Sequence, residues 1–276
     1  MRPGSGAVLG LALLAAILAA SSARAEEPAQ GPAQAPAQGS AQAPAQGSTQ
    51  DPAQSCEVPD YLLASDSSLP KVAEAVKAGH PLDILVVGSR SSTIGASEAS
   101  AYPARLQAML KQKLPQVAVN ISLDIEPAKT AEEIAASFVK LMEDKRPTLV
   151  IWQTGTVDAM RSVDPDDFRG AIDDGVAALQ NAGSDVILMN LQYSPRTESM
   201  ISAPPYLDNL RVVAQQHDVP LFDRFAIMRQ WNDSGDFDLF AASHGLDLAK
   251  RVHECLGRAL STFVVSAAHI GPAQQN

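Results

Sequence analysis

The order of apolar runs and helical patterns predicts a three-layer α/β domain, a doubly wound parallel sheet of about five strands with helices on both faces. The first observation is the run PLDILVVG at residues 81–88, which is continuous in Val, Ile and Leu as in strands buried on both faces. The second is the stretch YPARLQAMLKQKL that follows it, where Leu106, Met109 and Leu110 recur at helical spacing. Repetition of this pair along the chain favours parallel strands joined by helical crossovers.

The remaining elements follow in the same alternation. Further strand-like runs lie at residues 116–123 (QVAVNISL), 148–155 (TLVIWQTG), 185–191 (DVILMNL) and 219–223 (VPLFD). Helical patterns lie at residues 102–114, 130–145, 165–183, 206–217, 224–231 and 247–265. Ligands bind beyond the carboxyl ends of such strands, so the turns after Val87, Leu123, Gln153 and Leu191 are expected to share one rim.

Composition divides the chain of 276 residues into three regions. Residues 1–25 have a basic start, the apolar core AVLGLALLAAILAA and an Ala-Arg-Ala end, which predicts a cleaved secretory signal peptide; a retained N-terminal anchor is the alternative. Residues 26–55 repeat Pro, Ala and Gln without a large apolar residue, which is typical of a disordered linker. Residues 56–276 have the length of one domain. We therefore expect an exported protein, periplasmic or extracellular, with no transmembrane segment after cleavage.

Charge and cysteine content exclude several classes of function. The formal net charge is −10 and no basic cluster occurs, so neither nucleic acid nor an anionic membrane surface is an expected partner. No Gly-x-Gly-x-x-Gly or Walker-type lysine follows the first strand, which argues against nucleotide chemistry. The two cysteines, Cys56 and Cys255, are expected to form a disulfide in an exported protein; a thiol nucleophile or a metal pair is the alternative.

Three serines follow the first strand, in the stretch ILVVGSRSSTIGAS at residues 84–97. A serine becomes a nucleophile only where a base takes its proton and donors stabilise the oxyanion that forms. The SSTIG part matches Ser-x-Thr-x-Gly, and with the element order from Cys56 onward it resembles the first block of the SGNH, or GDSL-type, hydrolases. These are esterases, lipases and carbohydrate deacetylases on a flavodoxin-like sheet. The resemblance makes Ser91 the candidate nucleophile, with Ser89 and Ser92 as alternatives.

Later blocks of this family supply oxyanion donors, and here the sequence departs from the pattern. The resemblance implies a glycine after the second strand, but Pro127 or Ala128 stands there. It also implies an Asn after the third strand, where Val157 stands and has no side-chain donor. Neighbouring Thr156 and Asp158, like Gln153, could line the rim instead. The Ser91 backbone N–H then becomes the main expected oxyanion donor.

The last block of the family is Asp-x-x-His before the final helix. His244 is the candidate base, but Ala241 occupies the position three residues before it. Either Asp238 or Asp247 could orient His244, or the Asp and His of this block could be out of their usual order. His253 falls within the last helical pattern, one residue before Glu254 and close to Cys255, and is expected to be structural.

Two functions of different classes follow from these residues. The resemblance implies a serine esterase or carbohydrate deacetylase that acts on a small-molecule or glycan ester and needs no metal or organic cofactor. The alternative is a catalytically impaired binding or structural module of the cell envelope that keeps the fold. Whether Ser91 has a base and oxyanion donors around it decides between them.

Overall fold

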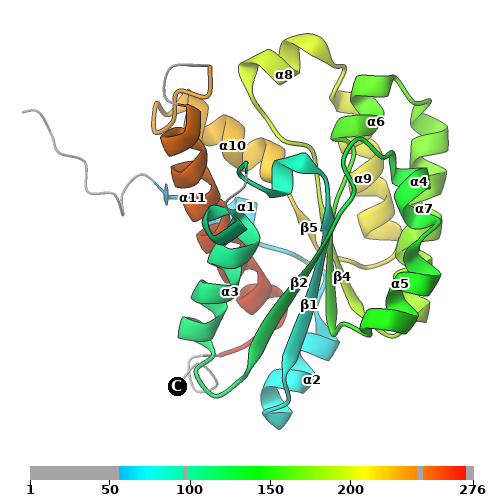
Figure 1. The fold of residues 1–276 in the computed structure, drawn as a ribbon, viewed down its shortest axis with the longest axis vertical. Coiled ribbons are helices and arrows are strands. Elements are labelled where there is room, and N and C mark those ends of the chain that lie inside the picture. The colour runs from blue at the N-terminus through cyan, green and yellow to red at the C-terminus, as the bar shows by residue number, and fades with distance from the viewer. Residues whose placement is uncertain (1–55, 96–97, 241–244, 272–276) are drawn as a thin grey trace, which may run out of the picture. The chain divides into compact units, whose positions relative to one another are not determined.

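A five-stranded parallel sheet forms the centre of the protein in a computed structural model that describes residues 56–95, 98–240 and 245–271 (Figure 1). The strands are β1 (Leu82–Gly88), β2 (Val119–Ile125), β3 (Leu149–Gln153), β4 (Asp185–Met189) and β5 (Leu221–Phe222). Their order is β2-β1-β3-β4-β5, and every neighbouring pair is parallel. This confirms the predicted fold class, since the order is that of a flavodoxin-like sheet. The predicted signal peptide and linker, residues 1–55, lie outside the described residues.

Helices cover both faces of the sheet (Figure 1). On one face lie α3 (Tyr102–Lys113), α10 (Arg224–Asp233) and α11 (Gly245–Ala267). On the other lie α4 (Ala131–Ala135), α5 (Phe138–Lys145), α7 (Pro165–Asn181) and α9 (Pro204–Gln216). Short helices α1 (Asp60–Leu63), α2 (Pro70–Ala78), α6 (Thr156–Arg161) and α8 (Pro195–Met200), with 3₁₀ turns η2 (Arg90–Ser92) and η3 (Glu98–Ser100), complete the described part.

Burial on both faces explains the continuous apolar strands. Every residue of β3 and β4 is buried. The largest side chain among them, Trp152, packs edge-on against Phe138 of α5, with ring centroids 4.8 Å apart. The fifth strand is short because only Leu221 and Phe222 pair with β4. The apolar runs therefore end where the sheet ends, and the polar residues that follow them lie at its carboxyl edge.

One predicted helix is broken in the structure. Residues 130–145 were expected to form a single helix, but α4 ends at Ala135 and α5 begins at Phe138. Between them, the hydroxyl of Ser137 donates a 2.7 Å hydrogen bond to the carbonyl of Ile134. Such local side-chain bonds compete with the regular helical pattern.

The N-terminal end of the described domain is fastened to the helical face. Cys56 forms the expected disulfide with Cys255 of α11. Close by in sequence, the carbonyl of Glu57 accepts a 2.9 Å hydrogen bond from the indole N–H of Trp231 on α10. None of the helices within the described ranges is both long and apolar enough to span a bilayer.

Candidate active site

The three serines after β1 occupy different environments. Ser92 is fully buried, and its hydroxyl donates a 2.8 Å hydrogen bond to Oε1 of Gln153. Ser89 and Ser91 are half-buried, and their hydroxyls lie 3.4 Å apart. The turn depends on Gly88, because a Cβ there would lie 2.3 Å from the Ser92 hydroxyl. Ser92 is thus inaccessible to a substrate, whereas Ser89 and Ser91 are accessible.

Gln153, the last residue of β3, accepts three hydrogen bonds at Oε1. The donors are the Ser92 hydroxyl, Nη1 of Arg224 at 2.9 Å and the Tyr102 hydroxyl at 3.3 Å. A guanidinium can only donate, so the atom that faces Arg224 must be the amide oxygen. Arg224 therefore fixes which way the amide of Gln153 points.

With that orientation, the Gln153 amide nitrogen faces the accessible serines. Nε2 donates to the hydroxyl of Ser91 at 2.8 Å and to that of Ser89 at 3.3 Å. The Ser91 oxygen is held as an acceptor, and its own proton is left to point elsewhere. Ser91 is the more closely held of the two hydroxyls.

Ser91 lines a cavity of about 190 Å³ between the carboxyl edge of the sheet and helices α10 and α11. Most of the lining is apolar, with polar groups from Ser91, Arg224, His253 and the loop after β4. The lining residues are Ser91, Gln192, Tyr193, Ser194, Arg224, Met228, Leu239, Gly245, Leu248, Ala249, Val252, His253 and Leu256. No Asp or Glu is among these described residues. A small, largely apolar ligand fits a cavity of this size and composition.

His253 lines the same cavity but is unsuited to act as a general base. Its Nδ1 accepts a 2.9 Å hydrogen bond from the backbone N–H of Tyr102. Burial and the nearby charge of Arg224 lower the pKa of His253 to about 4. The ring is therefore neutral at pH 7 and carries its proton on Nε2, which makes that atom a donor.

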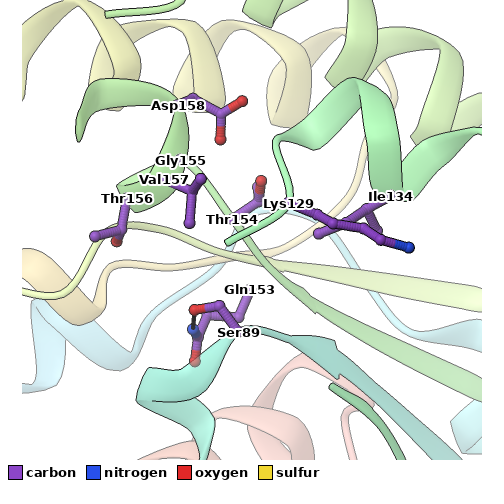
Figure 2. Close-up of a pocket in the computed structure, with 9 residues that line it drawn as sticks. All are labelled: Ser89, Lys129, Ile134, Gln153, Thr154, Gly155, Thr156, Val157 and Asp158. Carbon is purple, nitrogen blue, oxygen red and sulfur yellow. Dashed lines mark hydrogen bonds between the residues drawn. The ribbon is translucent and has the colours of Figure 1, made fainter. Parts of the chain in front are cut away.

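The predicted rim residues of α6 line a second, smaller cavity of about 10 Å³, with room for about one water molecule. Figure 2 shows Thr156 and Val157 across this cavity from Ser89 and Gln153. Val157 is half-buried and brings no donor, whereas the Thr156 hydroxyl accepts a 3.3 Å bond from the N–H of Gln192.

The buried carboxylate of Asp158 serves the adjacent helix. It accepts a 2.8 Å hydrogen bond from the N–H of Ala131 in the first turn of α4, and it also accepts from the N–H groups of Gly155 and Asp158 itself. Desolvation raises the pKa of Asp158, although these bonds oppose the change. Its oxygens are acceptors in this arrangement and fix α4 against α6.

The turn after β2 keeps a backbone feature that its sequence does not suggest. Ala128 has φ of 63°, in the left-handed region that glycine favours. This is one of the two positions at which the family resemblance implies a glycine. The turn therefore holds a glycine-like conformation without a glycine.

The predicted base, His244, is not among the described residues, so its pairing with Asp238 or Asp247 stays a prediction. Ala241 also lies outside the described residues. Asp238 is exposed, and Asp247 is exposed with Oδ1 3.7 Å from Nζ of Lys250. Ser91, His244, Asp238 and Asp247 stay predictions as catalytic residues.

Sequence reasoning missed the connection of Arg224 and Tyr102 to the serines. Arg224 lies two residues beyond Phe222, the last residue of β5, so the rule that placed the other strand ends on a rim could have included it. Tyr102 begins α3 and gave no such signal. In the part of the chain that the structure describes, no three His, Cys, Asp or Glu side chains form a metal-binding group.

Comparison with known proteins agrees with this architecture. The model of the non-GDSL lipase-like family matches residues 55–270. The chain belongs to this family. The match bears out the resemblance to SGNH/GDSL-type hydrolases, and "non-GDSL" fits a first block that reads Gly-Ser-Arg-Ser-Ser-Thr. No curated protein sequence is significantly similar to the chain.

Solved structures share the fold of this non-GDSL lipase-like chain at low identity. Axe2, an acetylxylan esterase from Geobacillus stearothermophilus, is 16% identical with a TM-score of 0.54, covering 69% of this chain and 95% of Axe2. LAE5, an α/β hydrolase from the metagenome of Lake Arreo, Spain, is 19% identical with a TM-score of 0.53, covering 68% and 94%. TesA is 20% identical with a TM-score of 0.51, covering 64% and 97%.

Proposed function

We propose that the protein is an exported serine hydrolase of carboxylic esters, with Ser91 as its nucleophile. The observation that carries the proposal is the position of Ser91, just beyond the carboxyl end of β1. Its hydroxyl accepts a hydrogen bond from Gln153, and the residue lines the 190 Å³ cavity. Membership in a lipase-like family supports the same reaction class.

In the proposed reaction, Ser91 Oγ attacks the ester carbonyl carbon while His244 takes the hydroxyl proton. The alcohol leaves with that proton, and an acyl group remains on Ser91. Water then attacks the acyl carbon, again with His244 as base, and releases a carboxylic acid. Asp238 or Asp247 would orient His244, and the backbone N–H of Ser91 would donate to the oxyanion.

The substrate we infer is a small-molecule or glycan ester with a short acyl group, such as an acetyl group on an extracellular or envelope glycan. The modest cavity volume and its apolar wall favour a short acyl chain. The signal-peptide pattern of residues 1–25 supports export to the periplasm or beyond.

A binding or structural module is the second candidate, and a specific observation favours it. Among the described residues, the Ser91 hydroxyl has hydrogen-bond partners only in Gln153 and Ser89, and Val157 brings no oxyanion donor. A protein that kept the cavity and lost turnover would have this arrangement.

The test is an assay of the purified protein on p-nitrophenyl acetate and butyrate beside Ser91→Ala and Ser89→Ala. We expect Ser91→Ala to lower kcat by about a thousandfold or more, as for removal of a nucleophile, and Ser89→Ala to retain most activity. A fluorophosphonate probe should label Ser91, as located by peptide mass spectrometry. Hydrolysis that survives Ser91→Ala would reject Ser91 as the nucleophile. A wild-type protein that neither turns over nor is labelled would reject the hydrolase in favour of the binding module.

A further inference from the structure

Arg224 is a buried cation with unused hydrogen-bond donors. Its side chain is 1% exposed, and only Nη1 has a partner, the amide oxygen of Gln153. Nε and Nη2 are buried without a hydrogen-bond partner among the described residues. Buried charged donors are normally satisfied, so two such atoms on one side chain call for an explanation.

No carboxylate of the described chain neutralises this guanidinium. None of the ion pairs between described residues includes Arg224. The adjacent Asp223 is bonded elsewhere, to Asn190 at 2.6 Å, to the N–H of Ala226 at 2.9 Å and to Arg211 at 3.3 Å. Burial lowers the pKa of Arg224 to about 10, which still leaves it charged at pH 7.

The cavity beside Ser91 is where an external anion could reach Arg224. Arg224 is among the residues that line this cavity, but its Nε and Nη2 are covered, so an anion in the cavity reaches them once the side chains over them shift. His253 lines it as a neutral ring with a proton on Nε2, a second donor. No described acidic side chain lines the cavity to repel an anion.

The geometry also selects the shape of the anion. Nε and Nη2 form one edge of the planar guanidinium, which matches the two oxygens of a carboxylate. The remaining wall is apolar, built by Met228, Leu239, Leu248, Val252 and Leu256. A small cavity with one cationic lining residue and apolar sides fits a carboxylate on a short aliphatic chain.

We propose that this cavity binds a short-chain aliphatic monocarboxylate, with Nε and Nη2 of Arg224 holding its carboxylate group. Such an acid is the kind of product that the proposed esterase would release, but binding needs no turnover. The inference therefore holds equally for a hydrolase and for a binding module.

The experiment measures hexanoate binding to the purified full chain by ligand-observed NMR at about 0.15 M salt, which limits repulsion by the net charge of −10. The neutral isostere hexanamide is the paired ligand. We expect a Kd on the order of 1 mM for hexanoate, given the efficiency of small ligands, and at least about tenfold weaker binding of hexanamide.

Variants assign the effect to Arg224. Arg224→Gln should weaken hexanoate binding about ten- to a hundredfold, and Arg224→Lys should fall between it and the wild type. Arg229→Gln is the matched control, since it removes one positive charge from the exposed side of α10 and should leave Kd unchanged. Ala249→Phe leaves Arg224 unchanged and fills the cavity with a larger side chain, so it should abolish hexanoate binding. This variant tests the proposal even if Arg224→Gln fails to fold.

The outcomes separate this inference from the proposed function. Binding without esterase activity would reject the hydrolase and keep the carboxylate site. Equal affinity for hexanoate and hexanamide, or equal Kd in wild type and Arg224→Gln, would overturn the carboxylate site even if the protein hydrolyses esters.

Discussion

At the scale of single residues, the site is a network of donors organised around one acceptor. The amide oxygen of Gln153 receives hydrogen bonds from Ser92, Tyr102 and Arg224, and its nitrogen positions Ser91. A buried polar network of this kind fixes one arrangement when its members are satisfied. Within this network, Nε and Nη2 of Arg224 have no hydrogen-bond partner among the described residues, so they are available to donate to an anion.

His253 gives this network a measurable dependence on pH. Its pKa is about 4 in the folded protein and near 6.5 when unfolded, so between these values only the unfolded chain binds the proton. The contribution of His253 to the free energy of unfolding should therefore fall as pH is lowered through this window, by about 2 kcal/mol from pH 7 to pH 5. His253→Asn keeps an acceptor for the Tyr102 N–H and removes the titration.

Urea denaturation of wild type and His253→Asn at pH 7 and pH 5 measures the contribution of His253. Asp185 acts with the opposite sign, because burial raises its pKa from 3.8 to about 6 and the folded protein gains its proton first. Asp185 is present in both proteins and cancels in the comparison. The same loss of stability in both would show that His253 does not titrate as expected.

At the scale of elements, the fold was predictable from local pattern and the site was not. Buried parallel strands and their helices each leave a periodic signal in a short stretch of sequence, as in residues 81–88. The groups around Ser91 come instead from β3, α3 and α10, which are distant in sequence. Nothing local marks Arg224 as buried, and the break at Ser137 depends on a single side-chain bond. The predicted nucleophile, Ser91, lies in a recognisable sequence motif, whereas Tyr102 and Arg224 do not.

Two glycines of α7 should respond to alanine with opposite signs. A Cβ on Gly175 would lie 2.5 Å from the Trp152 ring, which is fully buried and cannot move aside. Gly175→Ala should therefore destabilise the protein by about 1–3 kcal/mol through overpacking. Gly170 is exposed on the same helix with nothing within 4 Å of its Cβ position, so Gly170→Ala should stabilise by about 0.5–1 kcal/mol. Urea denaturation measures both, and a gain in stability from Gly175→Ala would refute the close packing of α7 on β3.

At the scale of the whole described domain, the disulfide joins the start of the described residues to helix α11. Cys56 and Cys255 are separated by 199 residues, so the disulfide closes a loop that includes the whole sheet. In the unfolded chain such a loop restricts the accessible conformations strongly. In the folded protein, the hydrogen bond from the Trp231 indole N–H to the Glu57 carbonyl holds the segment next to Cys56 and brings the indole ring close to that segment.

Loss of this disulfide should lower stability without changing the fold. The double variant Cys56→Ser with Cys255→Ala removes the link and puts an apolar residue at buried position 255. We expect the free energy of unfolding to fall by about 2–5 kcal/mol, since native disulfides of this kind typically contribute that much. The measurement is urea denaturation followed by tryptophan fluorescence, with the reduced wild type as the second sample. Both samples should unfold at lower urea than the oxidised wild type, whereas a variant with unchanged midpoint would show that the loop is already restricted in the unfolded chain.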